Sequence, residues 1–274
     1  MRFLTFILLF LLSGTAHAAE KPGIWIASGE VGGTYRRVYA TNFEKRLRSY
    51  DVFHRTTSGS GENLDLLASG KADIAFAQAD IYAGQLREDP ERLEGVVLIG
   101  QIATECVYIA YRKGGAVTSL AQLGQLVEGR PAKIAVGPAE GGASGTWRHF
   151  ATLVPALADT RVDHGGDTLA LNQLAAGAFD AMIWVTDPNN LRHKLLQAVR
   201  ANPELRLMRI DDPQLFYALP SGTPVYGRRT VALEDGWRAA KLTTVCTGAL
   251  VLARKDSDPE FIKALANIVS MYPR

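Results

Sequence analysis

Ser28-Gly29-Glu30-Val31-Gly32-Gly33-Thr34-Tyr35 is the stretch from which the fold of this chain can be read. It follows a short apolar run, Ile24-Trp25-Ile26-Ala27, which predicts a strand. The residues after it place apolar side chains at helical spacing: Tyr35, Tyr39, Phe43 and Leu47, with Val38 beside them. Glycines let a backbone approach a ligand, and the free N–H groups of a helix start attract anions. The pattern predicts a loop that holds a carboxylate or phosphate, although an ordinary strand-to-helix turn explains the glycines equally well.

The second half of the chain repeats the first. Glu140 to Arg148 is another glycine-rich stretch that leads into a helical pattern, and it mirrors Gly32 to Arg36. Four residues of the first half recur at the same offset of 107 residues: Leu67, Gly70, Asp73 and Asp80 are matched by Leu174, Gly177, Asp180 and Asp187. Both copies predict helix, glycine, strand and aspartate in that order. We therefore expect two related α/β lobes.

Two such lobes place their glycine loops across a shared cleft, because ligands of open parallel sheets lie at the carboxyl ends of the strands. The runs that begin at Cys106 and Cys246 resemble paired strands that cross between the lobes, although either could be an interior strand. The expected division is residues 19–106 with 246–274 for the first lobe and 107–245 for the second.

The N-terminus carries the signature of an export signal. Arg2 precedes the apolar run 3–12, and the small residues 13–18 end in an A-x-A-like cleavage site. Ten apolar residues are too few to span a bilayer as a mature helix. We expect cleavage after Ala18 and a soluble, periplasmic protein.

The charge and cysteine content of the chain limit the kinds of function that it can have. The 30 basic and 28 acidic residues nearly cancel and no long basic run occurs, which disfavours nucleic-acid or membrane-surface binding and suits a diffusing monomer. The only cysteines are Cys106 and Cys246. In an oxidising compartment we expect them to form a disulfide; two buried free thiols are the alternative.

Enzyme and metal sites find little support in the sequence. Gly142 to Thr146 is close to a nucleophile-elbow pattern, with His149 and His164 nearby, but its last position is Thr where Gly is required. Neither glycine loop carries the Gly-Lys-Ser/Thr of a nucleotide hydrolase or a full G-x-G-x-x-G. The histidines are scattered and no zinc-ligand spacing occurs. No catalytic residue, metal or cofactor is expected, and a serine-type hydrolase is the weakest alternative.

Seven short motifs are spread over the mature chain: Gly32 to Tyr35, Gly59 to Leu64, Gly70 to Asp73, Gln78 to Asp80, Ser119 to Leu123, Ala135 to Gly137 and Ser144 to Thr146. Through these motifs the chain resembles the TAXI class of solute receptors, the extracytoplasmic subunits of TRAP transporters. The resemblance implies an α/β, two-lobed periplasmic binding fold, type II-like, with a ligand cleft between the lobes. It implies capture of a small organic anion, an amino acid such as glutamate or a dicarboxylate, and delivery to TRAP-type permease subunits. A receptor that presents its closed form to a sensor kinase is the alternative.

Matching the motifs implies a set of ligand-binding residues. They are Gly33, Thr34, Tyr35, Arg36, Ser60, Gly61, Glu62, Gln78, Ser144, Gly145, Thr146 and Trp184. Arg36 stands where many members have a second Tyr, and Trp184 stands where a small residue is common. From the position of Arg36 beside the glycine loop we expect its guanidinium to hold the anion and Arg37 to point outward, although Arg36 could also face solvent.

Overall fold

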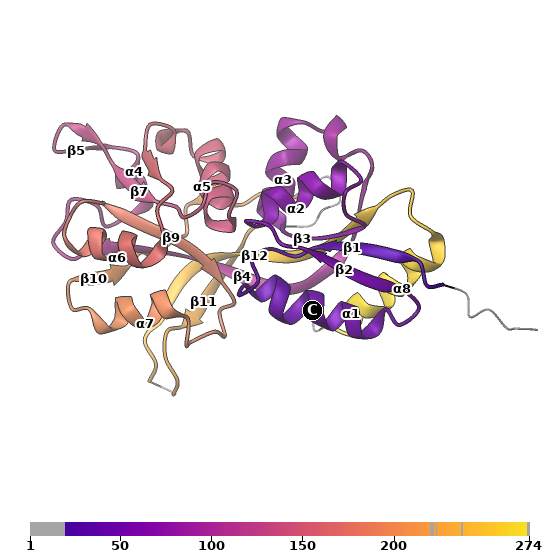
Figure 1. Cartoon of the computed structure of the whole chain (residues 1–274). Coiled ribbons are helices and arrows are strands. Elements are labelled where there is room, and N and C mark those ends of the chain that lie inside the picture. The colour runs from indigo at the N-terminus through magenta and orange to yellow at the C-terminus, as the bar shows by residue number, and fades with distance from the viewer. Residues whose placement is uncertain (1–19, 220–221, 223, 237, 273–274) are drawn as a thin grey trace, which may run out of the picture.

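The computed structural model describes residues 20–219, 222, 224–236 and 238–272. The signal peptide expected at residues 1–18 lies outside this range. Two α/β lobes lie side by side (Figure 1), and one ten-stranded sheet has strands in both. Its main path runs β2-β1-β3-β12-β4-β9-β7-β8, while β10 pairs with β4 and β11 with β12. Among the described residues, no helix is long and apolar enough to cross a membrane.

The first lobe is built from strand-helix-strand units around parallel strands. Its strands are β1 (Gly23–Ala27), β2 (Asp51–Arg55) and β3 (Ile74–Gln78). Its helices are η1 (Tyr35–Ala40), α1 (Thr41–Arg46), α2 (Ser60–Ala68), α3 (Ala79–Glu88), η2 (Glu91–Leu93) and α8 (Pro259–Val269). β1 pairs in parallel with both β2 and β3. Helical connections of this kind are what parallel pairing requires.

The helix predicted after the first glycine stretch begins as a π-helix, η1, and continues as α1. Tyr39, Phe43 and Leu47 are buried in the core of the first lobe, which confirms the predicted apolar face. Val38 was predicted to join them but is 47% exposed. The wider π turn changes which residues share a face, and such turns are frequent at functional sites.

The second lobe repeats this construction. Its strands are β5 (Leu126–Val127), β6 (Arg130–Pro131), β7 (Lys133–Ala135), β8 (Arg161–Asp163), β9 (Ala181–Thr186), β10 (Leu205–Leu207) and β11 (Gly227–Ala232). Its helices are α4 (Leu120–Leu123), α5 (Gly142–Leu153), η3 (Pro155–Leu157), α6 (Asp167–Ala175), α7 (Lys194–Ala201) and η4 (Pro213–Leu215). β7 pairs in parallel with β8 and β9.

The internal repeat predicted from the sequence is present in the structure. α2 and α6 end in the same way, since Gly70 and Gly177 follow them with φ of 70° and 81°. Residues other than glycine rarely adopt this left-handed conformation. In each lobe the following aspartate accepts a hydrogen bond from a backbone N–H of the neighbouring strand region. Asp73 Oδ2 lies 2.8 Å from the nitrogen of Trp25, and Asp180 Oδ2 lies 2.7 Å from the nitrogen of Lys133.

Two long antiparallel strands, β4 (Val96–Arg112) and β12 (Lys241–Arg254), connect the lobes. β4 pairs with β9 of the second lobe, and the carboxyl-terminal half of β12 pairs with β3 of the first. Both strands therefore belong to both lobes. The two cysteine-led runs were expected to pair with each other and to cross between the lobes, but residues 106–111 pair with β9 and residues 249–253 pair with β3, so the runs face each other only at the two cysteines. Cys106 lies opposite Cys246 in the ladder, and the two form a disulfide. We propose this pair as the boundary between the lobes.

Candidate functional site

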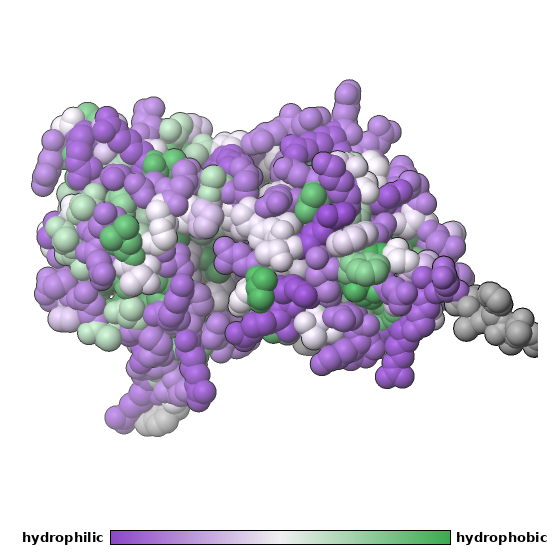
Figure 2. Space-filling model, viewed as in Figure 1, coloured by the Kyte–Doolittle hydropathy of each residue, from purple (hydrophilic) through white to green (hydrophobic). Residues whose placement is uncertain are grey.

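A cavity of about 410 Å³ lies between the lobes. Residues of both lobes line it, from the first glycine stretch and the start of α2 on one side and from the start of α5 and strand β9 on the other. In the space-filling view (Figure 2), hydrophilic side chains cover most of the visible face, and paler residues lie in the hollow between the lobes. The volume suits a small metabolite.

The first-lobe wall consists largely of backbone. Gly29 has a φ of 78°, and the Gly33 N–H donates to the carbonyl oxygen of Glu30 at 2.9 Å, which folds the glycine stretch into a tight turn. Ser58 and Ser60 flank Gly59 at the start of α2. The free N–H groups of this helix start, together with those of α5 across the cavity, favour a negatively charged ligand group.

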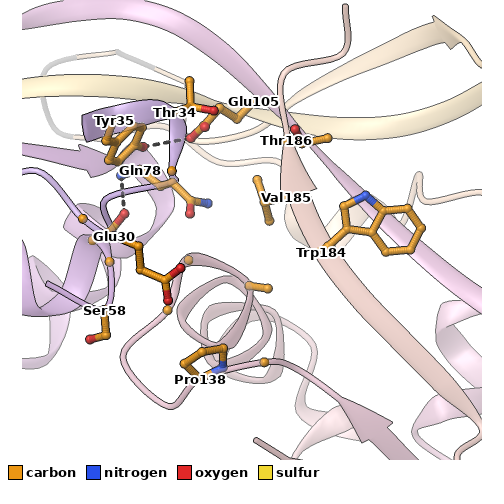
Figure 3. Close-up of a pocket in the computed structure, with 18 of the residues that line it drawn as sticks. Glu30, Thr34, Tyr35, Ser58, Gln78, Glu105, Pro138, Trp184, Val185 and Thr186 are labelled. Atoms are coloured by element: carbon orange, nitrogen blue, oxygen red, sulfur yellow. Dashed lines mark hydrogen bonds between the residues drawn. The ribbon is translucent and has the colours of Figure 1, made fainter. Parts of the chain in front are cut away.

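The second-lobe wall combines a helix start with an apolar strand. Gly141, Gly142 and Ala143 open α5, while residues 183–186 of β9 present a mainly apolar surface. Trp184 is only 4% exposed and stacks on Tyr108 with ring centroids 5.5 Å apart. Its Nε1 is buried without a hydrogen-bond partner. Figure 3 shows Trp184, Val185 and Thr186 along one side of the cavity and Tyr35, Gln78 and Glu30 along the other.

The lobes touch where the two helix starts meet. Gly59 adopts φ 146° and ψ −156°, and a Cβ there would lie 3.1 Å from the carbonyl oxygen of Glu140 and from Cα of Gly141. A Cβ on Gly142 would lie 2.0 Å from Oε1 of Gln78. Glycine at these positions allows backbone from the second lobe to pack directly against the first. The structure is therefore a closed arrangement of the lobes.

A buried polar network ties the lobes together beside the cavity. Asp80, fully buried at the start of α3, accepts hydrogen bonds from the hydroxyls of Thr146 at 2.6 Å and Tyr226 at 2.9 Å. Gln78 Nε2 donates to Thr146 Oγ1 at 3.1 Å. Burial raises the pKa of the Asp80 carboxyl, while the hydrogen bonds from Thr146 and Tyr226 act in the opposite direction. These contacts join the first lobe to α5 and the segment before β11.

A second buried carboxylate faces the cavity itself. Glu105 on β4 is 9% exposed, and the Tyr35 hydroxyl donates to its Oε2 at 2.8 Å (Figure 3). Burial raises the pKa of Glu105 to about 7, the Tyr35 hydrogen bond lowers it, and the charges of Asp80 and Asp187 raise it further. Burial and the adjacent carboxylate also hold the pKa of the Tyr35 phenol well above its ordinary value.

The other charged groups at the cavity are mixed in sign. Glu30 and Arg37 are exposed at its rim. Asp167 at the start of α6 forms an ion pair with Lys194 at 3.0 Å. Burial lowers the pKa of His193, which stacks on Trp184.

The structure brings together half of the ligand-binding residues expected from the sequence. The residues that line the cavity are Gly33, Thr34, Tyr35, Ser60, Gln78 and Trp184. The residues that do not are Arg36, Gly61, Glu62, Ser144, Gly145 and Thr146.

Local structure explains why these expected residues do not line the cavity. Helix α5 begins at Gly142, so Ser144, Gly145 and Thr146 lie inside the helix and not in a loop. The Glu62 carboxylate accepts hydrogen bonds at 2.8 Å from the N–H and the hydroxyl of Ser58, so it folds back onto the segment before α2. Gly61 packs near the Glu140 carboxylate.

The positions of Arg36 and Arg37 relative to the cavity are the reverse of those expected. Arg37, expected to point outward, is among the residues that line the cavity, and the half-buried Arg36 is not. The π turn that exposes Val38 also shifts these two positions around the helix. Within the described residues Arg37 forms no ion pair, so its guanidinium is available to a ligand.

Sequence reasoning missed Glu105, Glu30, Asp167 and His193. Glu105 directly precedes Cys106, which was expected to begin a crossing strand, and a charged residue in a strand that connects two lobes is the signal that points to it. Glu30 lies inside the first glycine stretch, where attention went to the glycines and the residues after them, and Asp167 and His193 carry no motif that marks them.

The hydrolase alternative gains no support from the geometry. His149 Nε2 lies 2.7 Å from the hydroxyl of Tyr217, and His164 Nδ1 lies 3.0 Å from the carbonyl oxygen of Gly137. In the described part of the chain, neither histidine forms a hydrogen bond with Ser144. Nor do the described residues contain a group of three or more potential metal ligands.

Comparison with known proteins identifies the family. The sequence matches the profile of the NMT1-like family over residues 26–269, which is most of the chain. The chain belongs to the NMT1-like family. No curated protein matches the sequence closely enough to add a further relative.

Solved structures similar to this NMT1-like protein share its two-lobed fold. A putative L-cystine ABC transporter protein from Listeria monocytogenes is 14% identical, with a TM-score of 0.53 over 91% of this chain and 89% of its own. Lactococcal OpuAC, closed on glycine betaine, is 12% identical with a TM-score of 0.53, over 90% and 84%. The GluR0 ligand-binding core from Nostoc punctiforme, in complex with L-glutamate, is 11% identical with a TM-score of 0.52, over 90% and 91%. At these identities the likeness establishes the fold, that of two-lobed periplasmic binding proteins.

Proposed function

We propose that this NMT1-like protein is a periplasmic receptor that captures a small organic anion, an amino acid such as glutamate or a dicarboxylate, and delivers it to a TRAP-type permease. The observation that carries the proposal is the cavity between the lobes, onto which the starts of α2 and α5 open from opposite sides. Helix starts stabilise a carboxylate without any cationic side chain.

Three further observations support it. The unpaired Arg37 at the rim offers a charged partner for a carboxylate. The apolar surface of β9 suits the carbon chain of a small metabolite. Of the three solved structures described above, two are complexes with a small carboxylate, glycine betaine in one and L-glutamate in the other.

A thermal-shift screen of amino acids and dicarboxylates tests the binding step. A ligand at a hundred times its dissociation constant adds about 2.7 kcal/mol to the free energy of unfolding. We expect a clear rise in the melting temperature for members of this set and none for sugars or polyamines. A screen in which no small carboxylate stabilises the protein removes the proposal.

Delivery to a permease needs a test in the cell that makes the protein. We expect deletion of the gene to abolish uptake of the ligand found by the screen, with restoration by a plasmid copy. Unchanged uptake, combined with loss of a transcriptional response to the ligand, assigns the receptor to a sensor kinase instead.

A further inference from the structure

Glu105 stands out among the residues of the cavity because its charge has no counterion among the described residues. Tyr35 donates to Oε2 at 2.8 Å, and this is the only hydrogen bond that the described residues make to the carboxylate. No lysine, arginine or histidine in the described range lies within ion-pair distance of it. Oε1 is not among the buried unpartnered atoms, so it is accessible from the cavity.

An unpaired carboxylate at 9% exposure is costly as an anion, and buried charges in proteins are ordinarily paired. The groups that face Glu105 do not relieve this cost. Tyr35 is a neutral donor, and the charges that act on Glu105, those of Asp80 and Asp187, are negative. The pKa of Glu105 is accordingly about 7, raised first by burial. A positively charged group in the cavity supplies the missing partner.

The position of Glu105 separates it from the anion-binding end of the cavity. In Figure 3, Glu105 and Tyr35 lie at one end of the drawn residues, and Ser58 and Pro138, beside the helix starts, lie at the other. A ligand whose carboxylate meets the starts of α2 and α5 extends toward Glu105 with its remaining polar group. The cavity thus offers hydrogen-bond donors at one end and a carboxylate at the other.

We infer that Glu105 is a specificity-determining residue, whose carboxylate selects ligands that carry an ammonium group together with a carboxylate. The inference rests on the proposed function and narrows its ligand class to amino acids, against dicarboxylates that lack an amine. A site built around a buried hydrogen-bonding group rejects an analogue without the matching group, because its own polar atom is then left unpaired.

Matched pairs of ligands test the inference. Calorimetric titration compares L-glutamate with glutarate and L-leucine with 4-methylpentanoate, since each pair differs by the α-amino group. The parent protein is expected to bind at least one amino acid ten- to a hundred-fold more tightly than its partner acid. Glu105→Gln keeps the size and removes the charge, and it is expected to abolish this preference. Glu88→Gln, at an exposed acid that does not line the cavity, is expected to retain it.

The pH dependence of affinity gives a readout that a merely structural role would not move. An ammonium ligand favours ionised Glu105, so the affinity of the parent for the amino acid is expected to rise between pH 6 and 8 and to level off above the Glu105 pKa of about 7. If a ligand carboxyl instead shares a proton with Glu105, affinity falls over the same range. If the Gln variant does not fold, this profile of the parent carries the test.

Each outcome is decisive. Equal binding within every pair, or a preference that survives Glu105→Gln, overturns the inference and leaves the proposed function standing. Binding of no member of either pair, together with no stabilisation by any carboxylate of the thermal-shift screen, overturns the proposed function, and the inference fails with it.

Discussion

Replacing Gly59 by Ala tests whether the two lobes meet as the structure has them. Gly59 adopts φ 146° and ψ −156°, a region essentially restricted to glycine. A side chain held there costs on the order of 1–3 kcal/mol of strain. The added Cβ also lies 3.1 Å from backbone atoms of Glu140 and Gly141 in the second lobe, so the opposite helix start must move by a few tenths of an ångström.

Two measurements separate the cost of the backbone strain from the cost of the contact with the second lobe. The strain acts whether or not the lobes touch, so the free protein is expected to lose about 1–3 kcal/mol of unfolding free energy in urea denaturation. The contact with the second lobe acts only in the closed form, so ligand affinity in calorimetry is expected to fall a further tenfold, about 1.4 kcal/mol.

Gly32→Ala is the matched control. Gly32 also lines the cavity, but nothing lies within 4 Å of the position that its Cβ would take. A surface substitution of this kind changes stability by less than about 0.5 kcal/mol. If Gly59→Ala matches the parent in both stability and affinity, the helix starts do not meet in solution and the reasoning is refuted.

Three further predictions concern charge, covalent structure and pH. Calorimetry is expected to show that Arg37→Ala weakens ligand binding by about 1.5–3 kcal/mol while Arg36→Ala changes it little, because only Arg37 of the two lines the cavity. A larger loss for Arg36→Ala than for Arg37→Ala would restore Arg36 to the site. Thiol titration of the unfolded, unreduced protein is expected to find no free sulfhydryl. Replacing both Cys106 and Cys246 by Ser is expected to cost about 5 kcal/mol, since their bond closes a loop of 140 residues; two reactive thiols contradict this. Burial, aided by the charge of Arg87, lowers the pKa of His149 to about 4, so the folded protein holds it neutral where the unfolded chain takes up a proton. The neutral imidazole therefore contributes up to about 3 kcal/mol to the free energy of unfolding, fully above pH 6.5 and progressively less as the pH falls toward 4. Denaturation curves at pH 7 and 4.5 are expected to show a smaller difference in unfolding free energy between the two pH values for His149→Gln than for the parent.

The sequence was sufficient for the architecture because the architecture depends on local patterns that recur. The Gly70–Asp73 and Gly177–Asp180 pairs each combine a helix end with a strand start, and both give the same geometry in the structure. The cysteine-led runs were apolar enough to indicate strands, and each is one half of a longer strand that crosses between the lobes. Hydrophobic periodicity and glycine position carry this information directly.

The site was harder to predict because it depends on where helices begin and how they turn. One residue of uncertainty at the start of α5 decides whether Ser144 faces the cavity or packs inside the helix. A π turn, which no propensity scale anticipates, exchanges the positions of Arg36 and Arg37. Glu105 became visible as a site residue only when the fold placed its strand beneath the cavity and its carboxylate against Tyr35.

A crystal structure of the protein with the small carboxylate identified by the thermal-shift screen tests the central claim most directly. We predict ligand density in the cavity of about 410 Å³ between the lobes, with a carboxylate at the starts of α2 and α5 and the contact at Gly59 preserved. Ligand density elsewhere on the molecule, with this cavity empty, would contradict the account.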